Sequence, residues 1–190
     1  MTINNQSFTD TIRIISNCFD SNPSVNAVIG SNGNRKLKIK NLAEYAFIKT
    51  NNRNGVLVSE NKKGVLLFYK SHVNPFNIKE LFYELKFALS IPFKNVLYSL
   101  QRESFIKKHR IYSNYIYCWF LGVEKGGDNA VYELKNKIFE LSNKENLPIL
   151  IETSVEKNKN IYQRYGFEVY YSWFDEKNNI TLWFMKRENK

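Results

Sequence analysis

Two apolar stretches, YIYCWFLGV at 115–123 and LPILIETS at 147–154, decide the fold of this chain. Both are apolar at odd and even positions alike, which is typical of strands buried on both faces of a sheet. Between them, apolar residues recur at helical spacing from Val131 to Leu141. A strand, a helix and a second strand in this order predict a right-handed β-α-β unit.

The same reading of apolar periodicity extends to the rest of the chain. The expected helices cover about 8–19, 37–49, 78–89, 94–107 and 157–165, and the expected strands cover 56–58, 65–69, 167–174 and 180–185. Polar turns at 61–64 and 175–179 join the two outer pairs of strands into hairpins. Gly166 is a natural end for the helix before it. Because we find no repeat and no low-complexity linker, we expect one domain over residues 1–190.

Composition excludes several classes of protein. The chain has 190 residues, of which 43% are hydrophobic and 15% aromatic, so it can bury a substantial core. Two cysteines and two histidines supply neither a disulfide framework nor a zinc motif, and we predict no metal site. The N-terminus lacks the pattern of a signal peptide, and the longest apolar run is far shorter than the roughly 20 residues of a membrane helix. We expect a cytoplasmic protein that does not enter a membrane.

The net charge of +10 is unevenly placed. Residues 61–120 carry ten basic and three acidic side chains, whereas residues 121–190 carry eleven of each. A basic segment with many aromatic residues is one feature of nucleic-acid binders, but it is equally a feature of a solvated lysine-rich face. The aromatic residues fall mostly at core periodicity, which weighs against nucleic acid as a partner.

The end of the first buried strand is a candidate anion site. The strand runs through Leu121, Gly122 and Val123 into a turn with two glycines and then directly into a helix. Such a junction directs free backbone amides and the positive end of a helix dipole at one point, which suits a diphosphate. An ordinary strand-to-helix turn remains the alternative. The candidate ligand residues of the turn are Lys125, Gly126, Gly127, Asp128, Asn129 and Ala130.

The end of the second buried strand is the other candidate site. Asn158 and Tyr162 lie four residues apart and therefore on one face of the predicted helix. A tyrosine hydroxyl in that place can protonate a departing thiolate, although a helical tyrosine can also serve packing alone. Glu152 lies near the end of the strand, where it acts as a base or, alternatively, faces solvent or caps the following turn.

Residues 115–185 resemble the C-terminal half of the GNAT acetyltransferase family. The resemblance rests on four stretches in the family's order: YIYCWFLGV, LPILIETS, NKNIYQRYGFEV and LWFMKR. It implies a mixed, mostly antiparallel twisted sheet flanked by helices and splayed between strands 115–123 and 147–154. Residues 1–114 would then form the acceptor side and residues 115–190 the side that binds acetyl-coenzyme A.

The resemblance also implies an activity, which is transfer of the acetyl group of acetyl-coenzyme A to a primary amine. The coenzyme would lie where the strands part beyond Phe120, with its pantetheine arm along the main chain of Leu121 and Val123. Asn158 would contact the coenzyme, Tyr162 would be the general acid, and the amine would attack directly. The acceptor would be a small molecule or a peptide, and the aromatic terminal hairpin would suit a homodimer.

The glycine turn departs from the family's phosphate loop. That loop reads Arg or Gln, two residues, Gly, one residue, then Gly or Ala, and the stretch 125–131 here is shorter. Asn129 and Val131 place β-carbons where the chain approaches the diphosphate, and Asp128 would repel it while Lys125 offsets this. The alternative function is therefore a degenerate GNAT fold that serves as a binding or regulatory module with weak or no coenzyme binding.

Overall fold

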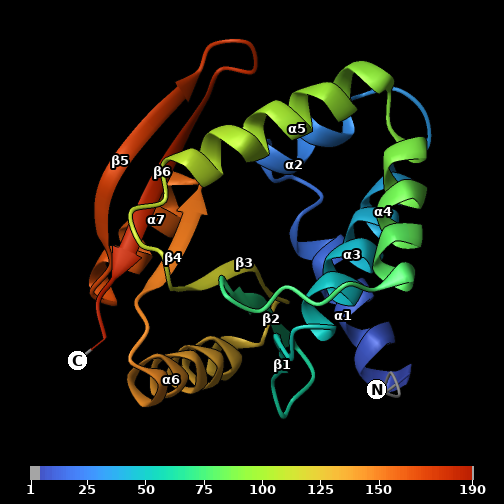
Figure 1. The fold of residues 1–190 in the computed structure, drawn as a ribbon. Coiled ribbons are helices and arrows are strands. Elements are labelled where there is room, and N and C mark those ends of the chain that lie inside the picture. The colour runs from blue at the N-terminus through green and yellow to red at the C-terminus, as the bar shows by residue number, and fades with distance from the viewer. Residues whose placement is uncertain (1–4, 190) are drawn as a thin grey trace.

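The computed structural model describes residues 5–189 as one six-stranded sheet with helices on both faces (Figure 1). The helices within these residues are α1 (Asn5–Cys18), α2 (Pro23–Ile29), α3 (Arg35–Asn51), α4 (Ile78–Ser90), α5 (Phe93–Lys108), α6 (Asp128–Glu145) and α7 (Glu156–Arg164). The strands are β1 (Val56–Val58), β2 (Gly64–Lys70), β3 (Ile116–Val123), β4 (Ile149–Thr153), β5 (Glu168–Asp175) and β6 (Ile180–Arg187). Every predicted helix and strand is present.

One helix, α2, is not among the elements that the sequence predicted. Seven residues make about two turns, too few for a helical apolar period to be visible. Its signals are local. The Asn22 side chain accepts a hydrogen bond from the Val25 amide at 3.1 Å, Pro23 occupies the first turn, and Gly30 ends the helix at a φ of 68°.

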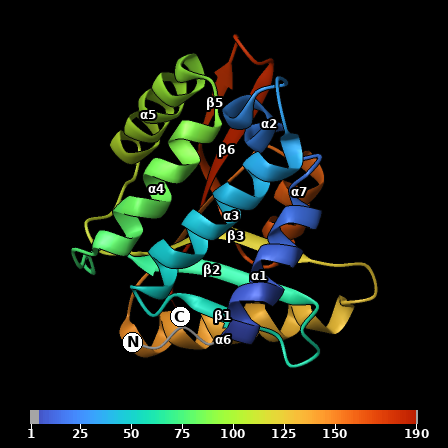
Figure 2. The ribbon, with the colours of Figure 1, turned by 90° about the vertical axis from the view of Figure 1, so that its right-hand side faces the viewer.

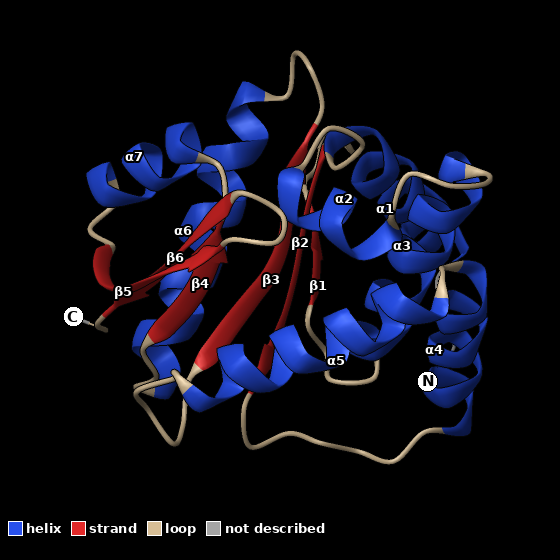
Figure 3. Ribbon diagram, turned by 90° about the horizontal axis from the view of Figure 1, so that it is seen from above, coloured by secondary structure: helices blue, strands red, loops and turns tan. Residues whose placement is uncertain are grey.

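The strands are ordered β1-β2-β3-β4-β6-β5, and this order can be followed in Figure 3. Four of the five neighbouring pairs are antiparallel, and β3 and β4 form the parallel pair. Helix α6 connects these two strands, as the β-α-β prediction requires. The expected mixed, mostly antiparallel sheet is confirmed.

The two faces of the sheet bury separate cores. One core packs α1 and α3 against β2 and β3 and contains Phe47, Leu67 and Phe120 (Figure 2). The other packs α6 and α7 against the opposite face and includes Leu134 and Ile151. Helix α5 crosses beyond the sheet and contacts the β5–β6 hairpin through Ile106.

Helix α4 is attached to α3 by its polar side rather than by its apolar stripe. Glu80 pairs with the buried Arg53 at 2.6 Å, Lys86 pairs with Glu44 at 2.6 Å, and the buried Phe87 is the apolar contact. The stripe that predicted this helix faces outward, with its five large side chains 55–78% exposed: Ile78, Leu81, Phe82, Leu85 and Leu89. Periodicity identifies a helix but does not say which face is covered.

We expect two alanine substitutions on α4 to separate these faces. Phe87→Ala removes a buried ring that stacks on Tyr45 at 6.3 Å, and should lower the free energy of unfolding by about 3 kcal/mol. Leu85→Ala removes an exposed side chain and should change it by about 0.5 kcal/mol or less. Urea unfolding at several protein concentrations measures both changes. Equal losses would show that the outer stripe is covered in solution.

Within residues 5–189, no helix combines the length and the apolar character needed to cross a bilayer.

Candidate active site

A β-bulge interrupts β3 at its centre. Leu67 of β2 pairs with Phe120, whereas the next residue of β2, Phe68, pairs with Cys118. Trp119 is therefore an extra residue without a partner position on β2. A bulge of this kind bends the strand and increases its twist. It lies at the point where β3 leaves its other neighbour, β4.

The bulge also reverses the direction of the main-chain groups along β3. The Ile116 amide donates a hydrogen bond toward the start of β4 at 2.9 Å, and the Glu124 amide donates toward the β1–β2 turn at 2.8 Å. In a regular strand, residues an even number apart, such as Ile116 and Glu124, direct their main-chain N–H groups to the same side. The extra residue of the bulge shifts this alternation by one position. Leu121 and Val123 therefore direct their N–H and C=O groups away from β2 and toward β4.

Strands β3 and β4 separate after a short contact. Among the described residues, two pairs join them, Ile116 with Ile149 and Tyr117 with Leu150. We expected the separation beyond Phe120, and it occurs earlier, because the bulge already turns the strand away at Trp119. The main-chain edge of β3 that carries Leu121 and Val123 therefore has no strand beside it.

A cavity of about 530 Å³ occupies this gap and extends between the two halves of the chain. It is lined by five of the residues that the sequence singled out: Leu121, Val123, Glu152, Asn158 and Tyr162. Asn158 and Tyr162 both reach it from α7, so their predicted common face is confirmed. Gly122 does not line it. A β-carbon there would lie 3.1 Å from Ile14, so this glycine serves the packing of α1 against the sheet.

Tyr162 enters the cavity from the α6–α7 side of the sheet. Its ring packs against Phe167 with 5.9 Å between centroids and belongs to the second core. Burial, with a smaller contribution from the nearby Cys118, raises the pKa of Tyr162 to about 12. The hydroxyl therefore keeps its proton at neutral pH. Burial likewise raises the pKa of Cys118 to about 12, which makes this thiol a poor nucleophile.

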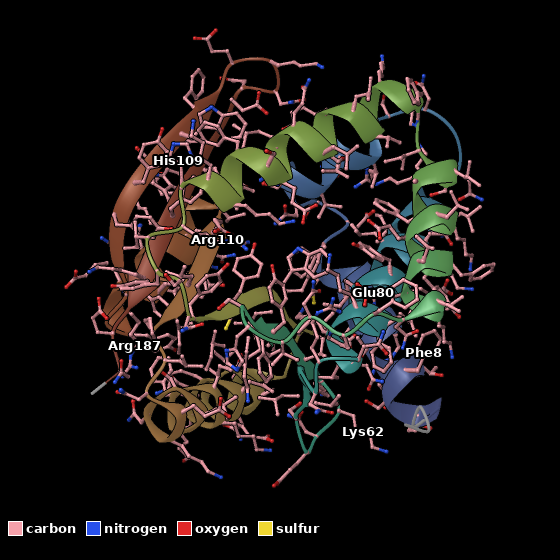
Figure 4. The ribbon with its side chains drawn as sticks, viewed as in Figure 1. Phe8, Lys62, Glu80, His109, Arg110 and Arg187 are labelled. Atoms are coloured by element: carbon pink, nitrogen blue, oxygen red, sulfur yellow. The ribbon has the colours of Figure 1, made fainter. Side chains whose placement is uncertain are left out.

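Glu152 enters the cavity from the opposite face. Its neighbour Ile151 belongs to the α6–α7 core, and side chains alternate along a strand. Its carboxylate accepts a hydrogen bond from the Tyr117 hydroxyl at 2.5 Å and lies 3.9 Å from Nε of Arg110. Figure 4 labels Arg110 just after the end of α5. Glu152 thus neither faces solvent nor caps the turn. Burial raises its pKa, while Arg110 and the Tyr117 hydroxyl partly offset that rise.

Arg110 and Tyr117 are site residues that the sequence analysis missed. Arg110 lies in the run Lys107–Arg110, which reads as a solvated loop, yet its side chain is only 6% exposed. Its guanidinium stacks 4.0 Å from the Tyr117 ring and donates to the Tyr115 hydroxyl at 3.0 Å. The aromatic spacing of Tyr115 and Tyr117 on one strand face was the available signal. One oxygen of Glu152 and Nε of Arg110 are buried without a hydrogen bond.

Solved acetyltransferases share this arrangement of strands and helices. A Corynebacterium glutamicum protein described as histone acetyltransferase HPA2 and related acetyltransferase aligns with a TM-score of 0.67 and 14% identity, over 100% of this chain and 95% of its own. Arylalkylamine N-acetyltransferase 2 of Aedes aegypti aligns with a TM-score of 0.62 and 16% identity, over 100% of this chain and 98% of its own. An N-acetyltransferase of Staphylococcus aureus Mu50 aligns with a TM-score of 0.59 and 15% identity, over 95% of each chain. The chain has the GNAT acetyltransferase fold.

The likeness is one of fold. No protein-family model matches the sequence, and no curated protein matches it. The resemblance that the sequence carried over residues 115–185 is thus confirmed as a GNAT fold, and the structural alignments extend it to the N-terminal half.

The glycine turn of this GNAT fold lies outside the cavity. None of residues 125–130 lines it, although the turn leads directly into α6. Gly127 precedes the helix without a side chain that caps the first amides. Lys63, from the β1–β2 turn, donates to the Gly126 carbonyl at 3.4 Å and adds a cation that the sequence analysis missed. The roles of residues 125–130 toward a coenzyme stay predictions.

The two glycines of the turn differ in the space around them. A β-carbon at Gly127 would lie 2.8 Å from Val123 and 2.9 Å from the Glu124 carbonyl, whereas at Gly126 the nearest atom is the flexible end of Lys63 at 3.4 Å. We expect Gly127→Asn to lower the free energy of unfolding by about 2 kcal/mol. Gly126→Asn keeps a φ of 75° that asparagine tolerates, and should cost about 1 kcal/mol or less. Thermal and urea unfolding of both variants measure these losses. Equal losses would contradict the tight contact around Gly127.

Within residues 5–189, no group of three or more His, Cys, Asp and Glu side chains is placed to hold a metal ion.

Proposed function

We propose that this chain is an N-acetyltransferase that transfers the acetyl group of acetyl-coenzyme A directly to a primary amine. The observation that carries the proposal is the separation of β3 from β4 after Tyr117, at a cavity that both halves of the GNAT fold line. In this gap a co-substrate can pair with the main chain as a neighbouring strand would.

The unpaired edge of β3 supplies the groups for such pairing. The main chain of Leu121 and Val123 faces the gap, which suits the amides of a pantetheine arm. An amide of this edge can also donate to the thioester carbonyl and stabilise negative charge on its oxygen during attack. Asn158 lines the same cavity and could offer a polar contact to the arm.

The diphosphate of the coenzyme would reach the start of α6. The first amides of this helix have no side-chain cap, and Lys63 lies beside the turn. Lys63 and Lys125 oppose the negative charge of Asp128, which is in the first helical turn. The turn therefore keeps the properties of an anion site although its sequence is shorter than the family's loop.

The acid and the base would act from opposite faces of the sheet. The amine nitrogen attacks the thioester carbon, and the carbon–sulfur bond breaks. Tyr162, which holds its proton at neutral pH, would give that proton to the departing sulfur. Glu152 would take the proton that the attacking nitrogen loses. One proton is given and one is taken, so the protons balance, and no nucleophile of the protein is needed.

Purified protein with acetyl-coenzyme A and a panel of small amines and short peptides is expected to release free thiol and to form the acetylated amine. A thiol reagent follows the first product and mass spectrometry identifies the second. Calorimetry should show coenzyme binding. If neither turnover nor coenzyme binding occurs, the transferase proposal fails, and the alternative of a binding or regulatory module with weak or no coenzyme binding is favoured.

The partners and the location stay predictions. We expect a small-molecule or peptide amine as acceptor and a cytoplasmic location, with nucleic acid not expected as a partner. Self-association of the β5–β6 hairpin stays a prediction that ultracentrifugation tests.

A further inference from the structure

The cavity continues from the gap toward α3, α4 and α5, and we call this part the acceptor side. Aromatic rings form part of its wall. Tyr45 stacks on Phe87 with 6.3 Å between centroids and meets Trp119 edge-on at 5.8 Å. All three line the cavity. An apolar or aromatic ligand body fits such a wall.

The acceptor side also holds more cations than anions. Glu103 is paired with Lys107 at 2.9 Å, so its charge is already balanced from outside the cavity. Glu152 is then the carboxylate that remains to face the cations. The charged residues that line this side are Lys49, Arg102, Glu103, Arg110 and Glu152.

Lys49 is a cation of this side that has no ion pair with a described residue and lies against the aromatic wall. No carboxylate of the described residues lies within 4.0 Å of its ammonium. The ammonium donates to the Tyr45 hydroxyl at 2.8 Å and lies 5.2 Å and 5.4 Å from the Tyr45 and Trp119 ring centroids. Burial lowers its pKa, and the carboxylates of Glu103, Glu84 and Glu80, which lie beyond ion-pair distance, offset only part of this effect. Keeping the ammonium charged here therefore costs free energy. A ligand anion would remove that cost.

We propose that the acceptor is an amine that has an apolar or aromatic body and a carboxylate, and that the carboxylate pairs with Lys49. This inference rests on the proposed acetyl transfer, because it names the acceptor class of the same cavity. Glu152 would meet the amine end near the gap, and Lys49 would meet the anionic end on the aromatic wall. Polyamines, which have cations at both ends, are disfavoured by the same charges.

The test compares amines that differ only by a carboxylate. Phenylalanine is compared with phenethylamine, and 4-(aminomethyl)benzoate with 4-methylbenzylamine, so that the carboxylate lies beside the amine or across the ring from it. At least one carboxylated member should have a KM about 10- to 100-fold lower than its partner. Calorimetry with the same four probes measures binding without turnover.

Lys49→Met should remove the preference by raising the KM of the carboxylated amine, while the KM of the neutral amine and both kcat values stay nearly unchanged. Lys49→Arg should retain most of the preference. Lys40→Met changes an exposed lysine on the same helix and is the control.

The inference is overturned if the neutral amines bind or react at least as well as the carboxylated ones, or if Lys49→Met leaves the ratio unchanged. Failure of the transferase proposal looks different, because no amine would then release thiol and no coenzyme would bind. In that case the binding comparison of the four probes still decides whether the cavity prefers a carboxylated amine through Lys49.

Discussion

Replacing Tyr162 with phenylalanine is expected to lower the kcat of acetyl transfer by about 100- to 10,000-fold. The change removes one oxygen and leaves the ring that packs against Phe167 at 5.9 Å. The coenzyme Kd should therefore change little. The departing sulfur, however, would lose the only side-chain proton donor that we assign to it. The rate of thiol release, followed with a thiol reagent, measures kcat, and calorimetry measures the coenzyme Kd.

The matched control is Tyr132→Phe, which removes the hydroxyl of an exposed tyrosine on α6 that does not line the cavity. It should keep the native kcat. Native turnover in Tyr162→Phe would reject the acid role. If the native protein shows neither turnover nor coenzyme binding, the binding or regulatory module that the shortened glycine turn suggested is favoured.

Replacing Glu152 with glutamine is expected to lower kcat/KM by about 100- to 1,000-fold at neutral pH. The amide has nearly the same shape but cannot accept the proton of the attacking nitrogen. The native kcat/KM should fall as the pH decreases through the pKa of Glu152. Because burial raises that pKa, the fall should occur at a higher pH than for an exposed glutamate. The variant should lack this acidic limb.

Tyr117→Phe tests the same carboxylate through its neighbour. The Tyr117 hydroxyl donates to Glu152 and lowers its pKa, so its removal should raise that pKa. The acidic limb of the kcat/KM profile should then move to higher pH while turnover at its plateau persists. We regard Tyr117 as a positioning residue. If the titration assigned to Glu152 remains in Glu152→Gln, in addition to the titration of the amine substrate itself, the assignment of the base is contradicted.

The sequence was sufficient to predict the elements because their signals are local. Burial on both faces marked β3 and β4, helical spacing marked α6, and Gly166 marked the end of α7. It was insufficient for α2, which is too short to show a period. It also did not reveal that the apolar stripe of α4 faces outward, because the ion pair of Arg53 with Glu80 attaches the other side.

The candidate site was predictable in part. Asn158 and Tyr162 on one helical face, and Leu121 and Val123 on one strand edge, follow from periodicity and from the family resemblance. The roles of Lys49 and Arg110 could not be predicted in this way, since a basic residue that is buried by distant segments has the same sequence context as one in solvent. Their place in the cavity depends on aromatic residues of other elements, among them Tyr117 and Trp119.

Apart from α2, the order of strands and helices, and with it the pair of parallel strands, was determined by the sequence alone, because periodicity is a property of neighbouring residues. The tertiary structure decided where that pair opens, which side chains face the opening and which charges lack a partner. Those outcomes depend on a single extra residue at Trp119 and on contacts between residues distant in the chain. Packing of that kind leaves no period in the sequence from which it could be predicted.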